Sequence, residues 1–133
     1  MITASGNKIA NPSIGQTEYL KYFKNRPANN RPDYILLQEE LRDIDVSAMK
    51  KAVSYFVSRH ESLRTIFPCI DGKIRQMILS AEEKKFGLDY LDISSAKDFV
   101  FEMERKYFEV LDVFSNVEAG PLSKSFLFKL NSD

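Results

Sequence analysis

An amphipathic helix that runs directly into a hairpin is the feature that most constrains the fold of this chain. Apolar residues recur at helical spacing over residues 45–60, and Asp45 or Ser47 can cap the N-terminus of this helix. Two β-rich runs follow within residues 63–79 and flank the dipeptide Asp71-Gly72. This dipeptide favours a tight hairpin turn because both turn positions need positive φ. The fold must therefore combine helices with antiparallel strands.

The rest of the chain contains further segments of the same two kinds. Residues 1–12 are small and polar and are predicted to be a flexible leader. Beyond them we predict a helix over residues 13–25 capped by Ser13, a second helix up to residue 111 that begins with a capping box of Ser95 and Asp98, and strands over residues 33–41, 86–93 and 122–130. We therefore expect one α+β domain in which helices pack mainly on one face of a mixed β-sheet.

The composition excludes several classes of function. The 133 residues include 19 Lys and Arg and 19 Asp and Glu, so no net charge attracts nucleic acid or anionic lipid. No apolar run approaches the roughly 20 residues that cross a bilayer. His60 and Cys69 are the only His and Cys, which excludes a zinc site and an internal disulfide. We expect no nucleic-acid or membrane partner, no metal, no directly bound cofactor and a cytoplasmic location.

Each side chain that could carry out chemistry also has a structural explanation. His60 could act as a base, but its place at a helix end also suits packing and the helix dipole. Cys69 could be a nucleophile, but it follows Pro68 in an apolar run, where we expect a buried and inert thiol. Glu39 and Glu40 are adjacent, so in a strand they point to opposite faces and are expected to be solvated.

Aromatic residues on the last helix permit two interpretations. They could form a hydrophobic binding groove, but helical spacing more often indicates core packing. Apolar residues cover more than one face of this helix, which is natural for a helix that packs against a further part of a protein. The residues concerned are Phe99, Phe101, Phe108 and Phe114.

The stretch from Ser58 to Phe67, SRHESLRTIF, places two arginines, a histidine and a glutamate between a helix end and a strand start. A purely structural connection would need only one capping residue. The stretch resembles the RHExLRTxF motif of the condensation domains of nonribosomal peptide synthetases. The residues that match this motif include Arg59, His60, Glu61, Leu63 and Arg64.

The resemblance continues on both sides of this motif and covers nearly the whole chain. Segments that are similar to other parts of the family's pattern are residues 13–20 with Gln16, residues 41–52, the hairpin around Gln76, and residues 113–122. Residues that depart from the family's usual choice are Gly15, Glu18, Ser123 and Lys124.

The resemblance implies one half of a chloramphenicol-acetyltransferase-like fold of two lobes, with residues 13–133 as the N-terminal lobe. In the complete domain, an acceptor amine attacks a donor thioester, and both are carried on the phosphopantetheine arms of carrier proteins. The implied partners are the C-terminal lobe and peptidyl or acyl carrier proteins, and a homodimer through the exposed lobe face is a further alternative. The family's catalytic motif, HHxxxDG, is absent from this sequence. We therefore expect the 133-residue chain alone to form no amide bonds.

Two other functions stay open: a stand-alone binding or scaffold module for carrier proteins, and a fragment of a related acyltransferase that uses coenzyme A. For the condensation domain, the resemblance implies that Arg64 reaches the aspartate of HHxxxDG while Arg59, His60 and Glu61 brace the corner between helix and strand. Without that aspartate, Arg64 is expected to be solvated or paired with Glu61, and its removal to leave the stability nearly unchanged.

Overall fold

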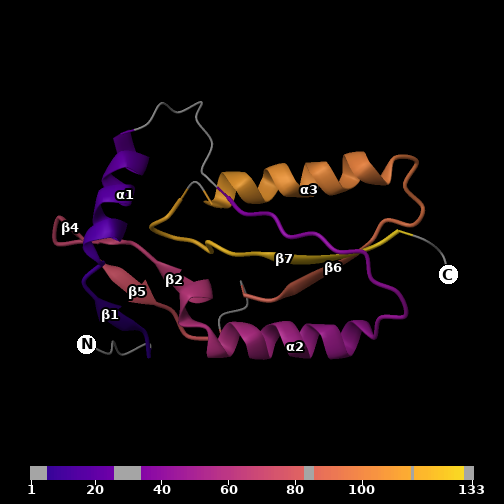
Figure 1. Ribbon diagram of the computed structural model, residues 1–133, viewed down its shortest axis with the longest axis horizontal. Helices are drawn as coiled ribbons and strands as arrows, with labels where there is room; N and C mark the ends of the chain where they lie inside the picture. Colours follow the sequence, from indigo (N-terminus) through magenta and orange to yellow (C-terminus); the bar gives the residue numbers. More distant parts are fainter. Residues whose placement is uncertain (1–5, 26–33, 83–85, 115, 131–133) are drawn as a thin grey trace.

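The computed structural model describes residues 6–25, 34–82, 86–114 and 116–130. Within these residues, helices and short strands form a mixed α/β structure (Figure 1), which confirms the predicted class. The helices are α1 (Ile14–Asn25), α2 (Val46–Arg59), the 3-10 helix η1 (Glu61–Arg64) and α3 (Phe99–Phe114). The strands are β1 (Lys8–Ala10), β2 (Thr65–Ile66), β3 (Cys69–Ile70), β4 (Lys73–Ile74), β5 (Gln76–Ile78), β6 (Leu88–Asp92) and β7 (Ser125–Lys129). The described strands form three small sheets and not one.

The hairpin predicted around Asp71-Gly72 is confirmed. Both residues have positive φ, 50° for Asp71 and 72° for Gly72, as a tight turn of this kind requires. β3 and β4 pair antiparallel on either side of the turn. Further from the turn, β2 pairs antiparallel with β5, so that Thr65 lies opposite Ile78. The hairpin therefore supplies two of the three sheets with strands.

The N-terminal strand β1 pairs antiparallel with the other edge of β5 and places Lys8 opposite Ile78. The order of this sheet is β1-β5-β2. The prediction of a flexible leader over residues 1–12 did not anticipate this strand, because three residues give no strand signal until the partner edge is known. Residues 1–5 of the leader lie outside the described part of the chain.

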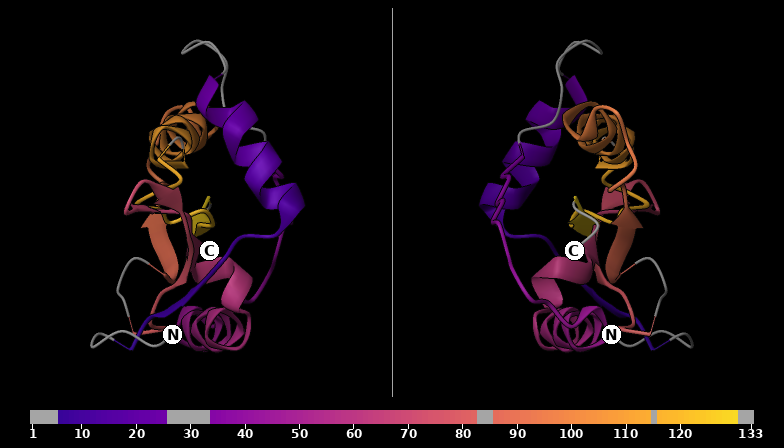
Figure 2. Two further views of the ribbon diagram at one scale, coloured as in Figure 1. Left: turned by 90° about the vertical axis from the view of Figure 1, so that its left-hand side faces the viewer. Right: turned by 90° about the vertical axis from the view of Figure 1, so that its right-hand side faces the viewer.

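β6 and β7 form a separate parallel pair, with Leu88 opposite Ser125 and Asp92 opposite Lys129. Parallel strands need a long crossover connection between them, and here this connection contains α3. α2 and α3 lie on opposite sides of this pair (Figure 1, Figure 2). At this pair the helices therefore cover two sides, where the sequence had predicted that helices lie mainly on one face.

The strand predicted over residues 33–41 is wrong for the residues that the structure describes, 34–41, which have no regular secondary structure. Ile35 and Leu37 are 90% and 88% exposed. Tyr34 contacts Tyr107 of α3, with ring centroids 6.4 Å apart. A short apolar run becomes a strand only when another strand accepts its backbone hydrogen bonds, and no described strand pairs with this segment.

The starts of the helices follow the predicted caps in two cases out of three. Ser13 caps α1, and at α2 the carboxylate of Asp45 accepts a hydrogen bond from the N–H of Ser47 at 2.8 Å. At α3 the cap is Asp98, whose carboxylate accepts from the N–H of Phe101 at 3.0 Å. The prediction placed Ser95 in that role, three residues too early.

A small apolar core lies where α2 meets the hairpin. Its buried residues are Val57, Ile66, Leu79 and Phe86, and Val53, Leu63 and Met77 pack against them. On α3, by contrast, Phe99, Phe101 and Phe108 are exposed, so the core interpretation is wrong for these three residues. α3 therefore presents apolar side chains that no described residue buries.

Candidate functional site

The SRHESLRTIF motif forms a corner where α2 ends, η1 makes one tight turn and β2 begins. We call residues 58–67 the motif corner. His60 is the C-cap of α2, and its N–H donates to the carbonyl of Phe56 at 3.1 Å. The ring centroids of His60 and Phe56 lie 4.3 Å apart. His60 therefore ends the helix and packs against it, as expected for a structural histidine.

Arg64 is held inside the motif corner. Its side chain is only 12% exposed, and Nη1 donates to the carbonyl oxygen of Leu79. The N–H of Leu79 donates in turn to the carbonyl of Arg64 at 3.0 Å. Nη2 of Arg64 lies 3.7 Å from Oε1 of Glu61. The expectation of a solvated Arg64 is therefore wrong, whereas its alternative, pairing with Glu61, is confirmed at the long end of the ion-pair range.

Glu61 connects the motif corner to β1. Its carboxylate accepts a hydrogen bond from Nζ of Lys8 at 2.5 Å, and its backbone carbonyl accepts one from the hydroxyl of Thr65 at 2.8 Å. The hydrogen bond from Lys8 is the main reason why the pKa of Glu61 is lowered, and the charges of Lys8 and Arg64 act in the same direction. This glutamate is therefore the acidic centre of a three-residue charge cluster.

Replacing Glu61 with Gln should make folding less sensitive to acid. The pKa of Glu61 in the folded chain lies below its ordinary value of 4.5, so the ion pair stabilises the fold above that pH. This contribution is lost as the pH falls through the folded-state pKa. The melting temperatures of the wild type and of Glu61→Gln should therefore converge at acidic pH.

Thermal melts at a series of pH values would measure this convergence. Glu104→Gln, which changes an exposed glutamate of α3, is the matched control, and its melting temperature should not show the same convergence. A difference between Glu61→Gln and the wild type that stays constant with pH would contradict the role of the Lys8–Glu61 pair.

Residues 117–123 close the other side of the motif corner, and we call them the closing strip. The hydroxyl of Ser123 donates to the carbonyl of Leu63 at 2.8 Å. The N–H of Phe67 donates to the carbonyl of Val117, also at 2.8 Å. Hydrogen bonds near both ends of the strip therefore attach it to the motif corner.

Gly120 brings the backbone of the closing strip against the core. Its φ is 58°, in the left-handed region that favours glycine. A Cβ at this position would lie 2.6 Å from Cγ2 of the buried Ile66, closer than real Cβ atoms approach another carbon. Only glycine fits both the backbone conformation and the space at this point.

Arg59 and Gln16 were also predicted as site residues. Among the described residues, their side chains form hydrogen bonds only within or at the start of their own helices and none with the other site residues. Nη1 of Arg59 donates to the hydroxyl of Tyr55 at 3.1 Å on the exposed surface of α2. Gln16 and Ser13 form a capping box at the start of α1. Oε1 of Gln16 accepts from the N–H of Ser13 at 2.8 Å, and Oγ of Ser13 accepts from the N–H of Gln16 at 3.2 Å. The motif corner thus combines His60, Glu61 and Arg64, with Leu63 packed on the core.

Cys69 is exposed, so the prediction of a buried thiol is wrong. It lies in β3, a two-residue strand in which Ile70 is the more buried residue. Among the described residues, no group of three or more His, Cys, Asp or Glu side chains could hold a metal ion. The helices described by the structure are all too short or too polar to cross a membrane.

Sequence reasoning missed three residues that hold the motif corner. Lys8 had no signal because it lies in the segment predicted to be a leader. Ser123 stands out in the sequence only as a departure from the family's pattern. Gly120 lies in residues 113–122, which resemble the family's pattern. That resemblance predicts a glycine here, but it does not predict the close approach of Gly120 to Ile66.

The fold has a counterpart among solved structures. It is similar to the crystal structure of the epimerization domain from the third module of tyrocidine synthetase B, with a TM-score of 0.53 and 22% sequence identity. The match covers 64% of this chain and 19% of that chain. The chain therefore has the fold of part of a domain of the condensation and epimerization type, within the chloramphenicol-acetyltransferase-like architecture.

The chain also resembles several curated proteins in sequence. No family model matches the chain. Bacitracin synthase 3 of Bacillus licheniformis is 28% identical over 133 aligned residues, which cover 98% of this chain. A linear gramicidin synthase of Brevibacillus parabrevis is 32% identical over 92 residues, or 68% of this chain. Isonitrile lipopeptide synthase of Mycobacterium tuberculosis (strain ATCC 25618 / H37Rv) is 42% identical over 52 residues, or 39% of this chain.

The chain spans about 2% of the length of each of these curated relatives. It is homologous to modules of nonribosomal peptide synthetases, as the motif corner had indicated, and it corresponds to a partial segment of a condensation or epimerization-type domain.

Proposed function

We propose that residues 13–133 are the N-terminal lobe of a condensation domain that forms amide bonds in nonribosomal peptide synthesis. In the complete domain, the nitrogen of the acceptor amine attacks the carbonyl carbon of the donor thioester. The C–S bond breaks, the thiol of the donor's phosphopantetheine arm leaves, and the amine gives up a proton. The partners are the C-terminal lobe and carrier proteins, in the cytoplasm. The lobe described here supplies the motif corner.

The observation that carries this proposal is the hydrogen bonding of Arg64. Nη1 and Nη2 of this residue have acceptors within the chain, but Nε is buried and has no hydrogen-bond partner. A buried donor without a partner costs about 1–3 kcal/mol, so an additional acceptor at this position would be favourable. A carboxylate suits this donor best, because a charge-assisted hydrogen bond to a guanidinium is the stronger kind. The aspartate of an HHxxxDG motif, which in the family comes shortly after the strand that corresponds to β7, would meet this requirement.

An assay of amide formation with loaded donor and acceptor carrier proteins tests the proposal. The chain alone should give no product, because the catalytic motif is absent from it. The chain mixed with a separately produced remainder of the domain, which carries HHxxxDG and the C-terminal lobe, should give the amide. Product from the chain alone would contradict the proposal, and so would inversion of the donor's Cα without amide formation, which would indicate an epimerization-type domain. Carrier-protein binding with neither reaction would favour the scaffold alternative.

A further inference from the structure

The pair of strands β6 and β7 has an open edge. These strands run parallel and, among the described residues, form a sheet of only two strands. A parallel strand alternately directs the N–H and C=O groups of its residues to its two sides. The side of β6 that faces away from β7 therefore has backbone groups able to accept another strand. Open edges of this kind are sites of pairing with another chain.

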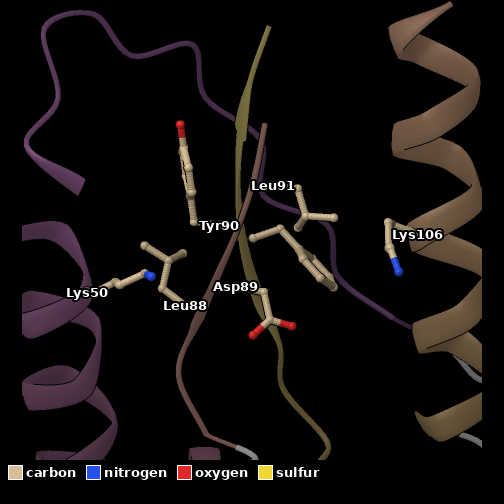
Figure 3. Close-up of a pocket in the computed structure, with 7 residues that line it drawn as sticks. Lys50, Leu88, Asp89, Tyr90, Leu91 and Lys106 are labelled. Atoms are coloured by element: carbon tan, nitrogen blue, oxygen red, sulfur yellow. The ribbon is translucent and has the colours of Figure 1, made fainter. Parts of the chain in front are cut away.

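A pocket of about 310 Å³ runs along this edge. Four consecutive residues of β6 line it but only one of β7, which places the pocket on the side of β6 that faces away from β7. Figure 3 shows Leu88 and Tyr90 on the side of α2, and Asp89 and Leu91 on the side of α3. The side chains of β6 that line the pocket therefore point alternately toward α2 and toward α3. A strand added to β6 would have side chains that alternate in the same way.

Two lysines flank the pocket from opposite sides, Lys50 from α2 and Lys106 from α3 (Figure 3). The ammonium of Lys50 lies 6.0 Å from the ring centroid of Tyr90. Lys106 already bonds Glu109 of its own helix at 2.7 Å, an exchangeable pair on the surface. The carboxylate of Asp89 is neutralised by Lys124 at 2.8 Å. An entering strand therefore meets a positive group on each of its two faces.

Residues 35–41, ILLQEEL, have the complementary pattern. They are exposed and pair with no described strand. In an extended conformation, the adjacent Glu39 and Glu40 point to opposite faces, so one carboxylate falls on the side of each lysine whichever way the strand is turned. Glu40 now lies 3.5 Å from Arg42 in a largely exposed ion pair, which is weak and easily exchanged. The remaining side chains of the segment are apolar except Gln38.

We propose that residues 35–41 of a second copy of this chain add as a strand to the open edge of β6. Glu39 and Glu40 of the second copy then pair with Lys50 and Lys106, one on each face. A second copy is the occupant because the segment of the same molecule lies on the side that carries α1, away from β6 (Figure 2). The contact covers apolar side chains of both copies. It also gives hydrogen-bond partners to the backbone N–H and C=O groups on the outer side of β6. The proposal is independent of the condensation function.

The mass of the chain in solution, measured by light scattering over a wide range of concentration, tests this association. The wild type should associate as its concentration rises. The charge reversals Lys50→Glu/Lys106→Glu and Glu39→Lys/Glu40→Lys should each raise the dissociation constant roughly tenfold or more, because like charges then face each other. Lys51→Glu/Lys97→Glu makes the same change of net charge at exposed positions outside the pocket, and it should associate as the wild type does.

Mixing the two charge-reversal variants provides the decisive measurement. In an equal mixture the charges are opposite in both contacts between the two variants, one contact in the native sense and one in the reversed sense, so association should return. A monomeric wild type, charge reversals that associate like the wild type, a control that dissociates as they do, or a mixture that stays monomeric would each overturn the proposal.

Hydrogen exchange on the unmodified chain gives a test that does not depend on how a variant folds. Association should slow amide exchange in residues 35–41 and in β6 together, because both gain backbone hydrogen bonds. Protection confined to another surface would overturn the proposal.

Discussion

Replacing Gly120 with Ala should lower the free energy of unfolding by about 2–5 kcal/mol. The left-handed backbone at this position costs an alanine about 1–2 kcal/mol. The added Cβ would also lie 2.6 Å from Cγ2 of Ile66, and overpacking of this kind costs about a further 1–3 kcal/mol. Ile66 cannot easily move aside, because it is β-branched and belongs to the buried core cluster.

Gly15→Ala is the matched control for this substitution. Gly15 lies within α1, and no atom comes within 4 Å of a Cβ at that position. Its replacement should leave the free energy of unfolding unchanged or raise it by up to about 1 kcal/mol, because alanine favours the helix. Urea unfolding followed by circular dichroism would measure both variants. Equal stabilities would mean that the closing strip does not pack on Ile66 as described.

Arg64→Ala should lower the free energy of unfolding by about 1.5–3 kcal/mol, because two hydrogen bonds from a charged group, to the carbonyls of Leu79 and Ser58, are lost and removal of the unpartnered Nε offsets only part of that loss. The substitution leaves the carbonyl of Leu79 without the donor Nη1, and Leu79 is a buried core residue. It also removes the ion pair with Glu61. This expectation replaces the one drawn from the family resemblance alone, that the loss of Arg64 would leave stability nearly unchanged.

Arg59→Ala is the control, because Arg59 is exposed and its hydrogen bond to Tyr55 lies on the surface of α2. Its effect should stay within about 0.5 kcal/mol. Arg64→Lys should fall between the two alanine variants, since one ammonium cannot replace the planar set of donors. Urea unfolding of the three variants measures the difference. If Arg64→Ala were as stable as Arg59→Ala, the side chain of Arg64 would be solvated, as the resemblance to the family had led us to expect.

Local signals predicted the parts of the fold that form within a few residues. Asp71-Gly72 specified its turn because few residue pairs accept positive φ at both positions. Asp45 specified the start of α2 because its short side chain reaches the free N–H groups of the first turn. The motif corner was located in the same way, since its residues are consecutive in the sequence.

Contacts between distant segments were beyond sequence reasoning. The apolar run at Ile35 has a typical strand composition, but composition does not supply the second strand that a sheet needs. The apolar neighbours of Cys69 predict a place in the interior, whereas β3 lies at the end of a hairpin and leaves this side chain exposed. Lys8 and Ser123 reach the motif corner from segments 53 and 60 residues away. Nothing in their local sequence indicates these destinations.

The pairing of β1 with β5 has a consequence for the order in which the fold is assembled during synthesis. Lys8 lies opposite Ile78, a separation of 70 residues (78 minus 8). The ribosome therefore releases β1 long before the strand that receives it has been translated. The helix α2, which needs only near neighbours, can form in the meantime, and the hairpin can close once β5 has been made. A strand that is made early therefore pairs only after the hairpin that receives it, although β6, α3 and β7 are translated later still.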